Sequence, residues 1–287
     1  AVIQEFRESG QTDYRGFSLP YGAGGVGVLT VCTQRPGGFT DDELIGLETL
    51  FAPLKLIIAA LESQRLARTV MQTYLGRQTG DLVLEGKIRR GEGELIDAAL
   101  WLCDLRDFTA LSEALGPKRT IAVMNAYFDC MAEAVWGAGG EILKFMGDAM
   151  LVVFRICDET TEAQAIKRAY RAAMRALEAL ERLDCSDVAG QPLDLRAGIA
   201  LHVGQVVYGN IGARTRLDFT IMGPAVNLLA RLQSFAGEHD RPIVMSSTFA
   251  DRLGRSVVSM GRQTFKGVSG ETEVWCPAPL DQPLDHG

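Results

Sequence analysis

Apolar positions recur along the chain with two different spacings. From Asp97 onward, stretches in which every second residue is apolar alternate with stretches that have the three-and-four spacing of a helix. Strands are predicted over residues 97–105, 193–212, 216–222 and 241–247, and a hairpin over 140–154. Helices are predicted over residues 108–139, with a break at Gly116-Pro117, over 160–182 and over 223–237. This order predicts an α+β fold of the ferredoxin-like sandwich type.

The first third of the chain follows another pattern. Residues 24–34 predict a strand, and a glycine-rich turn leads from it into a long helix with Thr40 or Asp41 as the N-cap. Pro53 is expected to bend this helix. Five of its apolar residues have the alternating spacing of a coiled-coil seam: Leu47, Leu50, Leu54, Ile57 and Leu61. Packing on a sheet of its own domain explains the first half of the helix equally well.

The strand, turn and helix resemble the C-terminal part of a GAF-type sensory domain. The resemblance covers residues 1–65, which are too few for a whole domain of ordinary size. Residues 66–96 are rich in glycine and charge, and they predict a connector to the part that follows. We expect the helix from Asp42 to about Thr73 to pair across a dimer and to set the orientation of two output domains.

Charge and composition exclude several classes of partner. The 287 residues have a formal net charge of -7, and 47% of them are hydrophobic. No nucleic-acid partner is expected, because such a partner needs a dominant positive surface. The six cysteines show no CxxC spacing, which predicts reduced thiols in a cytoplasmic protein. The three histidines lack the spacing of zinc ligands.

A membrane span is not expected within the chain. The most apolar helical stretch, residues 50–62, is short and is interrupted by Lys55. A membrane anchor outside the chain stays open.

Two aspartates stand at predicted strand ends. Asp104 closes the strand over residues 97–105, before a helix expected to begin at about Ala110, and Asp148 lies in the turn of the hairpin. Taken alone, the first is explained as a helix cap and the second as a turn residue. The predicted sheet, however, places both at neighbouring strand ends. Two convergent carboxylates without a histidine favour Mg²⁺ or Mn²⁺ held partly by substrate phosphates.

Five motifs, in order and at matching spacing, resemble the catalytic domain of the class III nucleotidyl cyclases. They read LCDLRDFTALSE, GGEILKFMGDAMLVVF, LRAGIALHVGQVVYGNIG, RLDFTIMGPAVNLLARLQ and FKGVSGETEVW. The resemblance covers about Glu94 to Cys276, and it implies a class III cyclase catalytic domain over residues 97–280. It also implies that Asp104 and Asp148 hold two divalent ions per site, with Phe108 and Thr109 in the adjoining substrate-binding loop.

The resemblance assigns the remaining site residues as well. Lys144 and Thr220 match the pair that recognises the base, and this combination is similar to that of adenine-selecting members. A lysine can donate to N1 of adenine, whereas guanine presents a donor at that position. Asn227 and Arg231 match the residues that orient the ribose and stabilise charge on the α-phosphate. Lys266 resembles a triphosphate-binding lysine, although a surface lysine after a turn is an equally good interpretation.

The implied activity is that of an adenylate cyclase, which converts ATP to 3',5'-cyclic AMP and pyrophosphate. In the family, two catalytic domains pair head to tail, and each site takes its aspartates from one protomer and its other residues from the partner. All six residue types occur in this chain, so a homodimer would build two sites. A guanylate cyclase and a catalytically silent nucleotide-binding module are the alternatives.

Two positions depart from the family's pattern. Pro224 stands where many members have aspartate, and the fold is expected to survive because the first position of a helix tolerates proline. Asp107 replaces a small residue before Phe108 and adds a negative charge near the phosphates. We expect this charge to weaken ATP binding or to alter metal preference.

Overall fold

The computed structural model describes residues 5–6, 8–21, 25–87 and 89–278. The chain divides into two compact units, Ala1–Leu84 and Glu85–Gly287. The division falls inside the predicted connector over residues 66–96.

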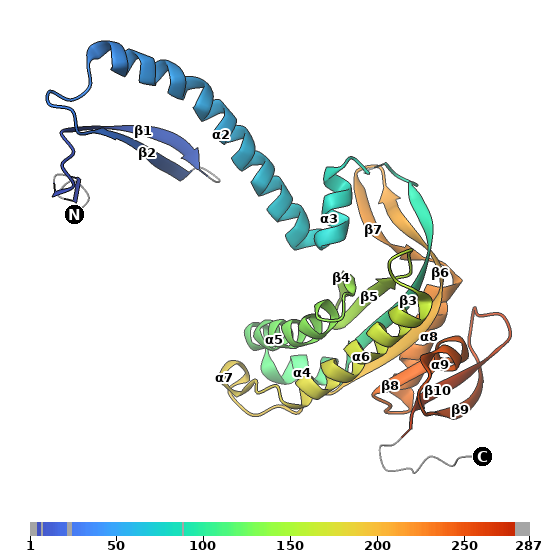
Figure 1. The fold of residues 1–287 in the computed structure, drawn as a ribbon. Coiled ribbons are helices and arrows are strands. Elements are labelled where there is room, and N and C mark those ends of the chain that lie inside the picture. Colours follow the sequence, from blue (N-terminus) through green and yellow to red (C-terminus); the bar gives the residue numbers. More distant parts are fainter. Residues whose placement is uncertain (1–4, 7, 22–24, 88, 279–287) are drawn as a thin grey trace. The chain divides into compact units, whose positions relative to one another are not determined.

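The first unit is a small sheet with helices (Figure 1). Strands β1 (Asp13–Tyr21) and β2 (Gly25–Thr33) are antiparallel, and α2 (Asp41–Leu75) and α3 (Arg77–Leu84) follow. Thr40 caps α2 through a reciprocal pair of bonds with Glu43, as one of the two predicted N-caps. Phe51 of α2 is buried and stacks on Phe17 of β1, with ring centroids 3.9 Å apart.

Helix α2 agrees closely with the long helix predicted from Asp42 to about Thr73. It continues through Pro53 for 35 residues, and it is long and apolar enough to cross a membrane by length and composition. The prediction that the apolar stretch over residues 50–62 is too short to cross a membrane was therefore wrong, because it is part of this longer apolar helix. One such helix is weak evidence for a span, because core helices of soluble proteins pass the same test. Three residues of the predicted seam are exposed within this unit: Leu50, Ile57 and Leu61.

The second unit is built on an eight-stranded sheet in the order β4-β5-β3-β6-β8-β10-β9, with β7 paired to β6. Its strands are β3 (Gly93–Leu105), β4 (Glu141–Met146), β5 (Ala149–Arg155), β6 (Ala197–Ala213), β7 (Arg216–Met222), β8 (Ile243–Ser246), β9 (Val257–Thr264) and β10 (Glu271–Pro277). Strands β6 and β8 pair in parallel, and the other pairings are antiparallel. The mixed sheet confirms the predicted α+β class.

Four helices of this unit follow the predicted order: α4 (Phe108–Leu115), α5 (Pro117–Trp136), α6 (Glu162–Glu181) and α8 (Pro224–Glu238). Two short ones, α7 (Ser186–Ala189) and α9 (Ser247–Leu253), were not predicted. The break at Gly116 is confirmed, and Pro224 occupies the first turn of α8 as expected. Helix α4 begins at Phe108, where the predicted helical range 108–139 begins, and two residues before the start expected at about Ala110.

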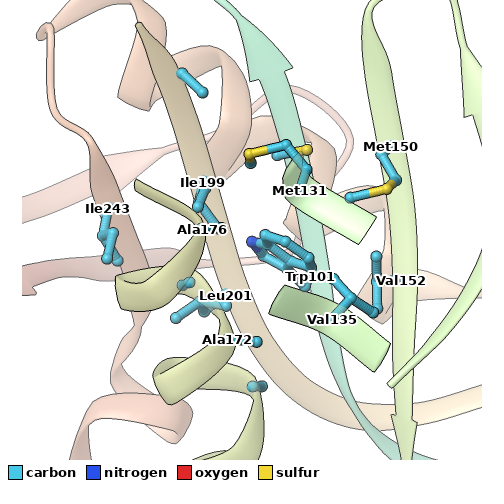
Figure 2. Close-up of a cluster of buried hydrophobic side chains, with 14 of the residues drawn as sticks. Trp101, Met131, Val135, Met150, Val152, Ala172, Ala176, Ile199, Leu201 and Ile243 are labelled. Atoms are coloured by element: carbon cyan, nitrogen blue, oxygen red, sulfur yellow. The ribbon is translucent and has the colours of Figure 1, made fainter. Parts of the chain in front are cut away.

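The core lies between the sheet and helices α5 and α6. Trp101 of β3 is fully buried at its centre, among side chains from both helices and from β5 and β6 (Figure 2). Buried alanines line the face of α6, including Ala172 and Ala176, and such small side chains allow the helix to approach the sheet closely. This packing fixes β3, whose end carries Asp104.

Candidate functional site

Pairing of β3 with β5 brings the two predicted metal-binding aspartates together. Cys103 of β3 lies opposite Met150 of β5. Asp104 comes directly after Cys103 and Asp148 comes two residues before Met150, so both aspartates lie at the same edge of the sheet. Gly147 has a φ of 68°, which a glycine adopts without strain in the hairpin turn before Asp148.

The two carboxyl groups interact directly. Burial, followed by the hydrogen bond and negative charge of Asp148, raises the pKa of Asp104 to about 7. A cation between the two carboxylates would relieve the repulsion that contributes to this shift, after the larger effect of burial. Among the described residues, no cluster of three or more metal-binding side chains occurs. The donor set therefore fits a hard divalent ion that takes its other ligands from substrate oxygens.

Asp107 starts the loop beside this pair in an unusual conformation. Its φ of 56° is left-handed, and its side chain makes no capping bond to α4. Instead, its carboxylate pairs with Arg196, whose Nη2 lies 3.3 Å from Oδ2. The charge that the sequence adds at Asp107 is thus partly balanced by a cation. The first turn of α4, with Phe108 and Thr109, keeps backbone N–H groups that suit an anion.

Arg106 joins the same loop to helix α8. Its Nη2 donates to the carbonyl oxygens of Ala236 at 2.7 Å and Arg241 at 2.9 Å. Its guanidinium lies against Gly198 of β6 and Gly237 of α8, where a side chain would collide with it. The end of α8 is therefore fixed to the loop that follows Asp104.

Lys144 and Thr220 lie on strands β4 and β7, which contact each other. Lys144 Nζ donates to Asp218 Oδ2 at 3.2 Å, and Asp218 stands two residues before Thr220 on β7. Thr220 is buried, and its Oγ1 has no hydrogen-bond partner among the described residues. A buried hydroxyl without a partner costs about 1–3 kcal/mol, which a ligand that hydrogen-bonds to it would recover.

The remaining three predicted residues come from helix α8 and from the segment between β9 and β10. Asn227 and Arg231 are exposed and four apart on this helix, so they share a face. Arg231 Nε donates to the carbonyl oxygen of Lys266 at 3.1 Å, which brings the β9–β10 turn beside the helix. Two of these three residues are thus in contact.

The sequence analysis missed three charged residues near the predicted ones: Arg106, Arg196 and Asp218. Their partners lie far away in the sequence, up to 135 residues for Arg106 and Arg241. Sequence position could have indicated two of these residues, because Arg106 and Asp218 each lie within two residues of a predicted site residue.

Comparisons with known proteins agree on the second unit. The model of the adenylate and guanylate cyclase catalytic domain matches residues 95–276. The chain is 29% identical over 174 residues to adenylate cyclase 1 of Rhizobium meliloti, which covers 60% of this chain and 26% of the relative. The matched part thus spans about a quarter of that relative's length.

Two solved structures resemble the same part. The adenylyl cyclase CyaB from P. aeruginosa is 26% identical with a TM-score of 0.57, over 67% of this chain and 100% of that one. The guanylyl cyclase Cya2 is 34% identical with a TM-score of 0.54, over 64% and 92%. Since both nucleotide specificities occur among the similar structures, similarity alone does not select between adenine and guanine.

Proposed function

Because the chain belongs to the adenylate and guanylate cyclase catalytic-domain family, we propose that it is an adenylate cyclase. It would convert ATP to 3',5'-cyclic AMP and pyrophosphate. The observation that carries this specificity is the pair formed by a lysine donor and a buried threonine hydroxyl on neighbouring strands. Lys144 Nζ can donate to N1 of adenine, and Thr220 Oγ1 can accept from the 6-amino group. Guanine offers a donor at N1, which would face the Lys144 ammonium donor with the wrong polarity, whereas the Thr220 hydroxyl can donate or accept, so discrimination against guanine depends mainly on Lys144.

The acidic pair supports metal-assisted phosphoryl transfer. Asp104 and Asp148 would hold two Mg²⁺ or Mn²⁺ ions, which would activate the ribose 3'-hydroxyl and neutralise the triphosphate. In the transfer, the 3'-hydroxyl gives up its proton to water and the 3'-oxygen bonds to the α-phosphorus. The bond from this phosphorus to the bridging oxygen breaks, and pyrophosphate leaves with the electron pair. Asn227 would orient the ribose, and Arg231 would stabilise charge on the α-phosphate. Phe108 and Thr109 would contact the substrate through the loop, and Lys266 would bind the triphosphate.

We place these residues in a head-to-tail homodimer. Each site would take Asp104 and Asp148 from one protomer and Lys144, Thr220 and the α8 pair from its partner. The catalytic unit would act in the cytoplasm, where ATP is available. The support for the dimer is the resemblance to the family and the presence of both halves of the site in one chain.

Product analysis tests the reaction itself. Purified protein is incubated with ATP or GTP and Mg²⁺ or Mn²⁺, and cyclic nucleotide and pyrophosphate are measured beside Asp148→Ala. We expect cyclic AMP that disappears in this variant but persists in Asp158→Ala, a control at an exposed aspartate that forms no ion pair with the described residues. Cyclic GMP as the main product would instead establish a guanylate cyclase. No product from either nucleotide would favour the silent nucleotide-binding module.

Mixing two inactive variants tests the dimer. Asp148→Ala and Asn227→Ala each damage a different half of the site, so their heterodimer would retain one intact site out of two. Random exchange of subunits at equal concentrations should restore about a quarter of wild-type activity. Activity that stays at the level of the separate variants, although subunits exchange, would refute the head-to-tail arrangement.

A further inference from the structure

The ammonium group of Lys144 is held by a residue that has no role in the mechanism above. Its Nζ lies 3.2 Å from Oδ2 of Asp218, across from β4 to β7. The Lys144 side chain is 30% exposed and that of Asp218 is 65% exposed. The carboxylate is thus the more exposed member of the pair, and Thr220, two residues after it on β7, is buried.

The strand fixes this arrangement. Asp218 and Thr220 are two residues apart on β7, so their side chains leave the same face. Phe219 leaves the opposite face and packs edge-on against Tyr208 of β6, with ring centroids 4.8 Å apart. A shift of the strand by one residue would expose Phe219 and turn both polar side chains away from Lys144.

Lys144, Thr220 and Asp218 differ in the hydrogen bonds and charge that they can offer. A lysine ammonium has three donors and sits on a flexible stem with several rotatable bonds. A threonine can accept a hydrogen bond, but it cannot balance the charge of the lysine. Asp218 supplies that charge and occupies one donor, which leaves the other two N–H groups for a ligand.

Building on the proposed function, we propose that Asp218 is a positioning residue for selection of the base. It holds the ammonium of Lys144 so that a remaining N–H meets N1 of adenine, while Thr220 accepts from the 6-amino group. Asp218 itself forms no bond to the base. Its effect on catalysis passes through Lys144, and it depends on an acceptor at position 1 of the purine.

This dependence separates the proposal from a purely structural ion pair. We would measure kcat and KM with ATP and with 1-deaza-ATP, in which a carbon replaces N1. The variants are Asp218→Asn, Lys144→Ala and the double variant, with Asp251→Asn as a control at another exposed aspartate. Thermal unfolding of each variant is recorded beside the kinetics.

Asp218→Asn should lower kcat/KM for ATP about three- to tenfold, mainly through KM. It should change kcat/KM for 1-deaza-ATP less than about twofold, and it should add nothing in the Lys144→Ala background. Equal losses with both substrates, or no loss with ATP, would overturn the proposal while leaving the cyclase intact. Failure of the wild-type protein to form cyclic AMP would overturn the proposed function and this inference with it.

Discussion

Replacing Gly198 by alanine should destabilise the catalytic unit, although its backbone conformation suits any residue. A Cβ at this position would overlap the Nη2 and Cζ atoms of Arg106. In a strand, alanine is otherwise more favourable than glycine by about 0.5–1 kcal/mol. Any loss of stability must therefore come from displacement of the guanidinium rather than from the backbone.

The contacts of Arg106 set the size of the effect. Its two bonds to the carbonyl oxygens of Ala236 and Arg241, at 2.7 and 2.9 Å, both come from a charged donor. Hydrogen bonds of this kind contribute about 1.5–3 kcal/mol each. Burial lowers the pKa of Arg106, which shows that part of this gain is offset by desolvation. Water can also reach the partly exposed end, so we expect a net loss of about 2–3 kcal/mol.

Urea denaturation of four proteins tests this reasoning: wild type, Gly198→Ala, Arg106→Ala and the double variant. Each single change should lower the free energy of unfolding by about 2–3 kcal/mol. The double variant should lose no more than Arg106→Ala alone, because the alanine then has nothing to displace. Unchanged stability in Gly198→Ala, or losses that add in the double variant, would refute the assigned role of Arg106.

Three other positions give separate expectations. Burial lowers the pKa of His202 from 6.5 to about 4, so the unfolded state binds more protons than the folded state between these pH values. The free energy of unfolding should therefore fall as the pH drops from about 6.5 to 4, by at most about 1.4 kcal/mol per pH unit. Denaturation at several pH values should show a smaller slope in His202→Gln. Trp101→Ala should cost about 3–5 kcal/mol in denaturant unfolding, because the indole fills the centre of the core. Trp101→Phe should cost clearly less, since its Nε1 has no hydrogen-bond partner among the described residues. Gly209→Ala should lower the melting temperature, because a Cβ would overlap the backbone oxygen of Glu92 and the Cα atom of Gly93, at the start of the neighbouring strand β3. A melting temperature equal to wild type would contradict the close approach of β3 and β6.

Local signals in the sequence predicted local features of the fold. Thr40 and Glu43 are three residues apart and form the capping box, and Gly116 ends α4 before Pro117 begins α5. The hairpin around Gly147 is likewise contained in one short segment. In each case, the residues that form the feature are close in sequence, so the pattern carries the needed information.

The sequence-based predictions failed where the deciding contact joins residues far apart in the sequence or where the backbone is strained. The start expected at about Ala110 was two residues late because Asp107, which pairs with Arg196 in the segment before β6, adopts a left-handed conformation that lets Phe108 begin the helix. The pairing of Lys144 with Asp218 joins residues 74 positions apart. No periodicity of the chain records which side chains such a sheet will bring together.

Arg106 matters for more than stability if the proposed dimer is correct. It stands two residues after Asp104, and it holds the C-terminal end of α8, whose earlier turns carry Asn227 and Arg231. In a head-to-tail dimer, the loop after Asp104 serves one site and α8 of the same protomer serves the other. A displacement of Arg106 would then disturb both sites of the dimer from a single subunit. In that dimer, this contact within one chain would be a physical link through which the geometry of one site constrains the other.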